Sequence, residues 1–136
     1  MDFLRSIAIA ASGLRAQAGR MRIIAENIAN ADSTAPTPGA DPYRRKIATF
    51  KSEVDRAIDA QTVAIGRVKT DPSDFRLKHE PGHPAADANG NVKFPNVNSL
   101  VEMMDMREAQ RSYEANINVI SASRRMIQRT IEILKS

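Results

Sequence analysis

Residues 99–136 read SLVEMMDMREAQRSYEANINVISASRRMIQRTIEILKS, and their large apolar side chains recur every seven residues. The stripe consists of Met106, Tyr113, Ile120, Ile127 and Leu134, with Ile117 in the same seam. A heptad repeat keeps one side of an α-helix turned toward a partner helix. The stretch therefore predicts one helix from Ser99 to the C-terminus. Ser99 and Glu102 fit the S-x-x-E capping box, which marks its start.

A second apolar stripe with a spacing of seven residues lies at the other end of the chain. It consists of Ile7, Leu14, Met21 and Ile28. The surrounding alanines favour a helix over residues 2 to about 31, with Asp2 as its N-cap. Gln17 is a polar residue in this seam, and such residues fix the register and number of partner helices. We expect the two ends to lie against each other or against copies of themselves.

The segment between the helices has the pattern of short strands and loops. Strands are expected over residues 43–52 and 62–69, with shorter ones at 75–77 and 92–94. Residues 53–60 suggest a helical turn or two, whereas the proline-rich segment 33–42 and the stretch 81–95 are expected to be loops. The fold class is therefore mainly α with a small β-rich insert over residues 33–98.

The charge balance first suggests nucleic acid or a membrane surface as a partner. The net charge is +4 and the pI is about 9.8. The C-terminal helix, however, carries nearly as many acidic as basic residues, and arginine suits paired, interface-forming charges. A solvated, ion-paired helix face is the simpler interpretation. The chain has no cysteine, which excludes disulfides and thiolate metal sites.

The short apolar run from Ile7 to Leu14 resembles the core of a signal peptide. Ser12 and Gly13 interrupt it, and the heptad stripe continues past the apparent cleavage site, so we expect no cleaved signal. No run approaches the ~20 apolar residues that span a bilayer. We expect no direct membrane insertion.

Residues that would carry chemistry are poorly grouped. His79 and His83 are four apart, but Pro81 and Pro84 exclude a helix holding both on one face. The segment 87–91 hints at a calcium loop, yet Asn98 stands where a bidentate glutamate is required. Nucleophile-elbow, phosphate-loop and zinc-protease motifs are absent from the sequence. We expect no enzyme, no metal and no cofactor.

Several short motifs resemble those of the bacterial flagellar rod, hook and hook-associated axial proteins. Ser12-Gly13-Leu14, Gln17, Met21 and Asn27-Ile28-Ala29-Asn30 are similar to the N-terminal signature of that family. The segments 42–46, 81–84, 94–98 and 113–116 are similar to those of its proximal-rod members. The resemblance covers the whole chain, although Asn91 stands where an aromatic residue is common.

The resemblance implies a structural subunit of the proximal rod in the periplasm, which transmits torque from motor to hook. It implies uncleaved export by the flagellar type III apparatus, and assembly with other rod proteins and with copies of itself in a helical tube. The terminal helices, residues 1–32 and 99–136, would then form one elongated, discontinuous domain packed as an antiparallel coiled coil. The insert would lie outside it.

The expected assembly interface combines both stripes with polar positions from the family motifs. It comprises Ile7, Leu14, Gln17, Met21, Asn27, Ile28, Asn30, Tyr43, Arg44, Arg45, Met106, Tyr113, Asn116, Ile117, Ile120, Ile127 and Leu134. Asn27 and Asn30 have two interpretations, a helix stop in which Asn adopts the left-handed conformation, or recognition between subunits. The alternative function is a basic helical adaptor that binds nucleic acid with a steep salt dependence.

Overall fold

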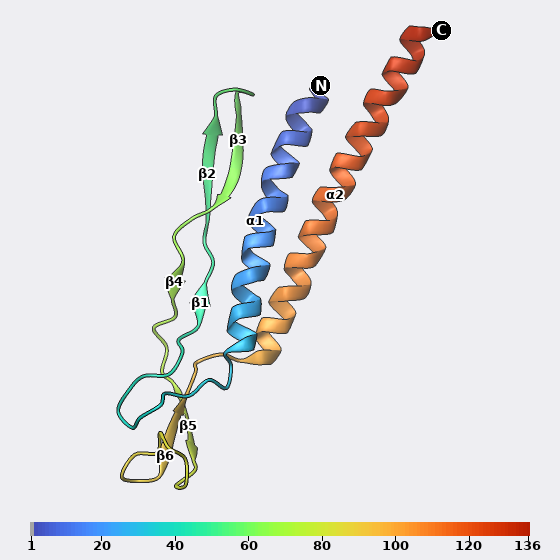
Figure 1. Cartoon of the computed structure of the whole chain (residues 1–136). Helices are drawn as coiled ribbons and strands as arrows, with labels where there is room; N and C mark the ends of the chain where they lie inside the picture. The colour runs from blue at the N-terminus through green and yellow to red at the C-terminus, as the bar shows by residue number, and fades with distance from the viewer. Residues whose placement is uncertain (1) are drawn as a thin grey trace. The chain divides into compact units, whose positions relative to one another are not determined.

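The computed structural model describes residues 2–136, which form two long helices and six short strands (Figure 1). The elements are α1 Phe3–Ala29, β1 Lys46–Ile47, β2 Phe50–Asp55, β3 Ala60–Ile65, β4 Lys69–Thr70, β5 Arg76–His79, β6 Asn91–Phe94 and α2 Ser99–Lys135. The predicted mainly helical fold with a small β-rich insert is confirmed. Among residues 2–136, no helix combines the length and apolar character needed to cross a membrane.

The starts of the two helices show one correct and one wrong prediction. Asp2 caps α1, because its Oδ1 accepts the backbone N–H groups of Leu4 and Arg5 at 3.1 and 3.2 Å. The capping box at the start of α2 is wrong. There the cap is Asn98, whose Oδ1 accepts the N–H of Leu100 at 3.1 Å and of Val101 at 3.4 Å.

The side chain of Glu102 explains this correction. It is buried, with 1% of its area exposed, and it forms an ion pair with Arg45. A buried carboxylate gains more from a cationic partner than from a backbone N–H at an exposed helix end. The side chain of Glu102 therefore points into the protein, and Asn98, the residue before Ser99, caps the helix.

The strands form three antiparallel, two-stranded ladders, β1 with β4, β2 with β3 and β5 with β6. The predicted strand over 43–52 splits into β1 and the first half of β2, and that over 62–69 splits into β3 and β4. The helical turn expected at 53–60 is wrong. Residues 53–55 extend β2, and the turn that follows contains Asp59 at a φ of 48°.

Cross-strand pairing explains that correction, because Glu53 and Asp55 lie opposite Thr62 and Ala60 of β3. The local helical preference of the segment is weak, and ladder hydrogen bonds override it. The loop expected at 81–95 is also wrong at its end, where residues 91–94 form β6. The short strands expected at 75–77 and 92–94 correspond to β5 and β6.

The chain divides into two compact units. One consists of residues up to 21 with 49–67 and 107–136, and the other of residues 22–48 and 68–106. Each helix contributes a segment to both. The division into a helical domain (1–32 and 99–136) and an insert (33–98) stays a prediction.

In the first unit, small side chains allow close packing of α1. A Cβ atom added to Gly13 would lie 2.8 Å from the Nδ2 of Asn116 on α2. The backbone N–H of Val63 in β3 donates to Ser12 Oγ at 3.2 Å. In the second unit, Ala85, Val92 and Phe94 form an apolar cluster against which Ala86 packs.

The corrected cap predicts a difference between two adjacent positions. Asn98→Ala should lower the free energy of unfolding by about 1 kcal/mol, because it removes the acceptor for two N–H groups. Ser99→Ala should be nearly neutral. Urea denaturation of the purified subunit measures both, and an equal loss at Ser99 would restore the capping box.

Candidate assembly interface

The two predicted stripes lie partly exposed on their helices. Ile7, Leu14, Met21 and Ile28 of α1 are half-buried, as are Met106, Tyr113, Ile120 and Ile127 of α2, whereas Leu134 is exposed. The fully buried apolar positions of the two helices include the small residues Ala10, Ala16 and Ala109, together with Ile23 and Ile24. Within this single chain, the stripe side chains therefore keep surface available to other molecules.

One line along α2 is more exposed than the half-buried stripe. Met103, Ile117 and Ile131 follow one another at intervals of 14 residues and are 55%, 41% and 47% exposed. Gln110 and Arg124, halfway between them, are also exposed.

An open hollow in the first unit is lined by Asp2, Phe3, Leu4 and Ile127.

Two of the predicted polar interface residues, Asn116 and Asn30, donate hydrogen bonds to the carbonyl oxygen four residues earlier in the chain. Asn116 donates from Nδ2 to Ser112 O at 3.1 Å. Asn30 donates from Nδ2 to Glu26 O at 2.9 Å. Asn30 is not in the left-handed conformation, which among non-glycine residues of the described chain only Asp59 adopts. Helix α1 does end directly before Asn30, so only the left-handed geometry expected for this helix stop is wrong.

Gln17 has a different position. Its Oε1 is buried and has no hydrogen-bond partner within residues 2–136. Buried carbonyl oxygens are rarely left unpaired in folded proteins. Gln17 was expected to be a polar residue in an apolar seam, and its buried, unpaired Oε1 agrees with that expectation.

Asn27 anchors the extended segment 43–46 in the second unit. Its Nδ2 donates to Lys46 O at 2.8 Å, and its Oδ1 accepts the Lys46 N–H at 2.9 Å. The hydroxyl of Tyr43 donates to the same Oδ1 at 2.7 Å. With 1% of its area exposed, Asn27 pairs with the Lys46 backbone as a neighbouring strand would.

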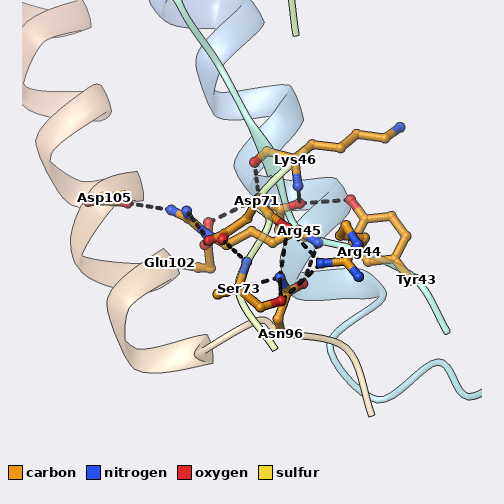
Figure 2. Close-up of polar contacts among 10 residues, drawn as sticks. Tyr43, Arg44, Arg45, Lys46, Asp71, Ser73, Asn96, Glu102 and Asp105 are labelled. Atoms are coloured by element: carbon orange, nitrogen blue, oxygen red, sulfur yellow. Dashed lines mark hydrogen bonds and ion pairs between the residues drawn. The ribbon is translucent and has the colours of Figure 1, made fainter. Parts of the chain in front are cut away.

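Arg45 lies among three carboxylates (Figure 2). Its guanidinium binds Glu102, and it reaches Asp71 at 3.3 Å and Asp105 at 3.6 Å. Its backbone N–H donates to Asn96 Oδ1 at 2.8 Å. Because Asn27 Nδ2 also approaches Glu102 Oε2 at 3.3 Å, the polar contacts of Asn27 and Arg45 form one continuous network. We call Asn27, Arg45, Asp71, Asn96 and Glu102 the polar cluster.

The other basic side chains of segment 43–46 also have partners within the chain. Arg44 donates to the carbonyl oxygens of Asp71 and Ser73, both at 2.9 Å, and its guanidinium lies 4.2 Å from the Phe75 ring centroid. Lys46 pairs with Glu26 at 3.2 Å. Both side chains are therefore held within the chain, Lys46 by a carboxylate and Arg44 by carbonyl oxygens and an aromatic ring.

Shifted pKa values are found at Tyr43, beside the polar cluster, and at Asp71, within it. Burial, with the nearby carboxylates of Glu26 and Glu102, raises the pKa of Tyr43, so its hydroxyl remains a donor. Hydrogen bonds from Ser73, followed by the Arg45 guanidinium, lower the pKa of Asp71. Asp71 therefore stays charged beside Arg45 at neutral pH.

Sequence reasoning found one half of the polar cluster and missed the other. Asn27 and Arg45 were expected in the interface, whereas Asp71 was missed and Glu102 was given a capping role. Asn96 belongs to the 94–98 motif but had no role. An Asp before Pro72 is an ordinary loop feature, and no local pattern links it to an arginine 26 residues earlier.

The polar cluster offers no group of three or more metal-ligating side chains, and neither does any other part of residues 2–136. His83 contributes to a loop, in which its Nδ1 accepts the Ala85 N–H at 3.0 Å. Its Nε2 lies 3.4 Å from Thr34 Oγ1. His83 thus has ordinary structural contacts.

Comparisons with known proteins identify the family of this chain. The family described as "Flagella basal body rod protein" matches residues 7–36, and "Flagellar basal body rod FlgEFG protein C-terminal" matches residues 88–133. The chain is 55% identical over 128 residues to the flagellar basal-body rod protein FlgC of Agrobacterium fabrum, covering 94% of this chain and 92% of that protein.

The chain belongs to the FlgC family of flagellar basal-body rod proteins.

More distant FlgC proteins also match nearly end to end. Identity is 41% to the protein of Salmonella typhimurium, with 98% of both chains covered. It is 35% to that of Bacillus subtilis, with 99% of this chain and all of that protein covered. The family consists of structural rod subunits and not of enzymes, so the chain is a structural subunit of the basal-body rod. The nucleic-acid-binding alternative finds no support among these FlgC relatives.

The polar cluster predicts a large cost for removing Arg45. Arg45→Ala leaves Glu102 buried without its cation and should lower the free energy of unfolding by about 3–5 kcal/mol. The double variant Arg45→Met with Glu102→Met should recover much of that loss. Lys46→Met is the matched control, because its ion pair with Glu26 is exposed and worth less than about 1 kcal/mol. Urea denaturation that gave equal losses for both single variants would contradict this role.

The lowered pKa of Asp71 predicts an acid-sensitive contribution to stability. A depressed pKa in the folded state means that stability is present above the unfolded pKa of about 3.9 and is lost as pH falls through the folded value. Asp71→Asn should therefore lose less stability than the unmodified chain on acidification from about pH 5 to about pH 2. Urea midpoints across that range measure the difference, and parallel curves would exclude it.

Proposed function

We propose that this rod subunit belongs to the proximal part of the rod, in the periplasm, where it passes torque from motor to hook. It joins other rod proteins and copies of itself in a helical tube. The observation that carries this proposal is the apolar line Met103, Ile117 and Ile131 on α2. A large exposed apolar surface on a soluble chain is typical of an interaction site.

The terminal helices form the inner layer of the tube, packed as an antiparallel coiled coil. Two contacts in the first unit support this direction. Gly13 lies against Asn116, and Arg20 pairs with Glu108 at 3.6 Å, so positions further along α1 meet earlier positions on α2. Apart from the exposed Leu134, the stripe residues are half-buried, and their exposed parts then contact neighbouring subunits.

Assembly completes the folding of the helix ends. Residues 128–135 of α2 are all exposed, so the end of this helix gains little from its own chain. Gly13 and Gly19 each lower helix stability by about 1 kcal/mol relative to Ala. Burying one Leu or Ile contributes about 1.5–3 kcal/mol. Neighbours that cover Ile131 and Leu134 therefore offset the entropy cost of ordering the helix.

Weak isolated helices also fit export. We propose that the subunit leaves the cytoplasm through the flagellar type III apparatus, unfolded and without a cleaved signal. The absence of cysteine keeps the chain free of disulfides in the periplasm. In the assembled subunit, the polar cluster contributes indirectly, since it holds Tyr43, Arg44 and Arg45 at fixed positions.

The exposed line on α2 gives a direct test. Ile117→Asp places a charge on a surface that neighbours bury, so rod occupancy and swimming should be lost while the purified subunit keeps its stability. Asn118→Asp, at the adjacent exposed position, is the control and should assemble. Immunoblots of membrane-stripped hook–basal bodies measure occupancy, and normal amounts of the Ile117→Asp protein would remove the proposed interface.

A further inference from the structure

In the part of the chain that the structure describes, every strand of the three two-stranded ladders has one edge without a strand partner, and β2 and β5 are exposed along their whole length. Within residues 2–136, β2 pairs only with β3, and β5 pairs only with β6. All six residues of β2 and all four of β5 are exposed. An open strand edge presents backbone N–H and C=O groups that can pair with another strand.

The ladder geometry identifies the unpaired groups of β2. Gly66 N donates to Thr49 O at 2.7 Å, in the register that continues through β2 and β3. Hydrogen-bonded pairs alternate along an antiparallel ladder, so Phe50, Ser52 and Val54 direct their backbone groups outward. Val63, which lies opposite Ser52, agrees with this alternation, because its N–H points away from β2 and donates to Ser12 Oγ.

The same reasoning applies to β5. Glu80 N donates to Gly90 O at 2.9 Å, in register with the β5–β6 ladder. The alternation then leaves the backbone groups of Leu77 and His79 directed outward. A further strand could therefore pair with the backbone N–H and C=O groups of three alternate residues in β2 and of two in β5.

The two edges are complementary in a single antiparallel register. Placing Val54 opposite Leu77 also places Ser52 opposite His79, and all four residues direct their backbone groups outward. On the other face, this register sets Glu53 opposite Lys78 and Asp55 opposite Arg76. Val54 and Leu77 are each 64% exposed, so their contact would cover apolar surface that the chain leaves open.

Existing contacts of these side chains make Glu53 and Lys78 the central charge pair. Arg76 already donates to Pro95 O at 3.0 Å and to Ala31 O at 2.9 Å. Lys78 lies 4.7 Å from the Phe94 ring centroid and has no recorded carboxylate partner within residues 2–136. Glu53 pairs with Lys51 at 2.5 Å, where both are about half exposed, and such surface pairs exchange partners at little cost.

We propose that β5 of one copy adds to the free edge of β2 in the next copy, with Val54 opposite Leu77. Pairing of β5 with β5 is disfavoured, because it would bring basic strands together. Each copy carries one edge of each kind, so the contact is head-to-tail and extends into an open helical array. The inference rests on the proposed function only for the presence of adjacent copies in the rod.

Cysteine cross-linking tests the register, since the chain has no cysteine of its own. Ser52→Cys with His79→Cys keeps the charged and apolar pairs. Their Cα atoms would lie about 5.5 Å apart as a hydrogen-bonded pair, within reach of a disulfide. Mild oxidation of purified basal bodies should give a ladder of covalent multimers. Lys51→Cys with His79→Cys, whose side chains would point to opposite faces, should give far less.

Single-cysteine variants and an immunoblot separate the possible failures. Either single variant should stay monomeric, and a covalent dimer from one of them would show like edges pairing and overturn the proposal. Monomers alone from the Ser52→Cys/His79→Cys chain, at normal rod occupancy, would also overturn it while leaving the rod function intact. Absence of the unmodified chain from basal bodies would instead remove the proposed function.

A charge exchange at the neighbouring pair, Glu53 and Lys78, tests the same contact through electrostatics. With the Ser52/His79 cysteines as reporters, Glu53→Lys or Lys78→Glu alone should reduce multimer yield about two- to fivefold. The double exchange should restore it. Equal yields in all four chains, or a double exchange no better than the singles, would overturn the proposed register.

Discussion

The ion pair between Arg45 and Glu102 is the interaction on which the second unit depends. Glu102 belongs to the first turns of α2, and Arg45 precedes the first strand after α1. A carboxylate this buried is tolerated only with a cation and further hydrogen bonds. Arg45 provides the cation and Asn27 of α1 provides an amide. The contact therefore fixes three segments that are far apart in sequence.

The same ion pair changes the meaning of nearby residues. Because Glu102 turns inward, Asn98 must cap α2. Because Arg45 is held among carboxylates, the basic segment 43–46 is a structural element of the subunit and not a free cationic patch. Asn27 replaces a strand partner for Lys46, which gives a physical reason for a buried asparagine near the end of an otherwise apolar helix.

The first unit follows a different rule. Gly13 of α1 lies against Asn116 of α2 and Ala109 is buried, while large apolar side chains remain partly exposed along α2. A monomer gains little from such an arrangement, since apolar area left in water contributes nothing to its stability. In the proposed assembly, the same surface would be the source of cohesion between subunits. The proposed pairing of the open β2 and β5 edges would extend this principle from side chains to the backbone.

Local pattern determined the two helices, the β-rich middle and the family, because heptad spacing and short motifs are properties of neighbouring residues. It also singled out Asn27 and Arg45, but as interface residues, whereas the fold uses both within the chain. It failed where the deciding partner is distant in sequence. Glu102 reads as a capping residue until Arg45 is near it, and residues 53–55 read as helix until β3 pairs with them. Burial of a charge and strand pairing are tertiary events, so only the folded chain decides them.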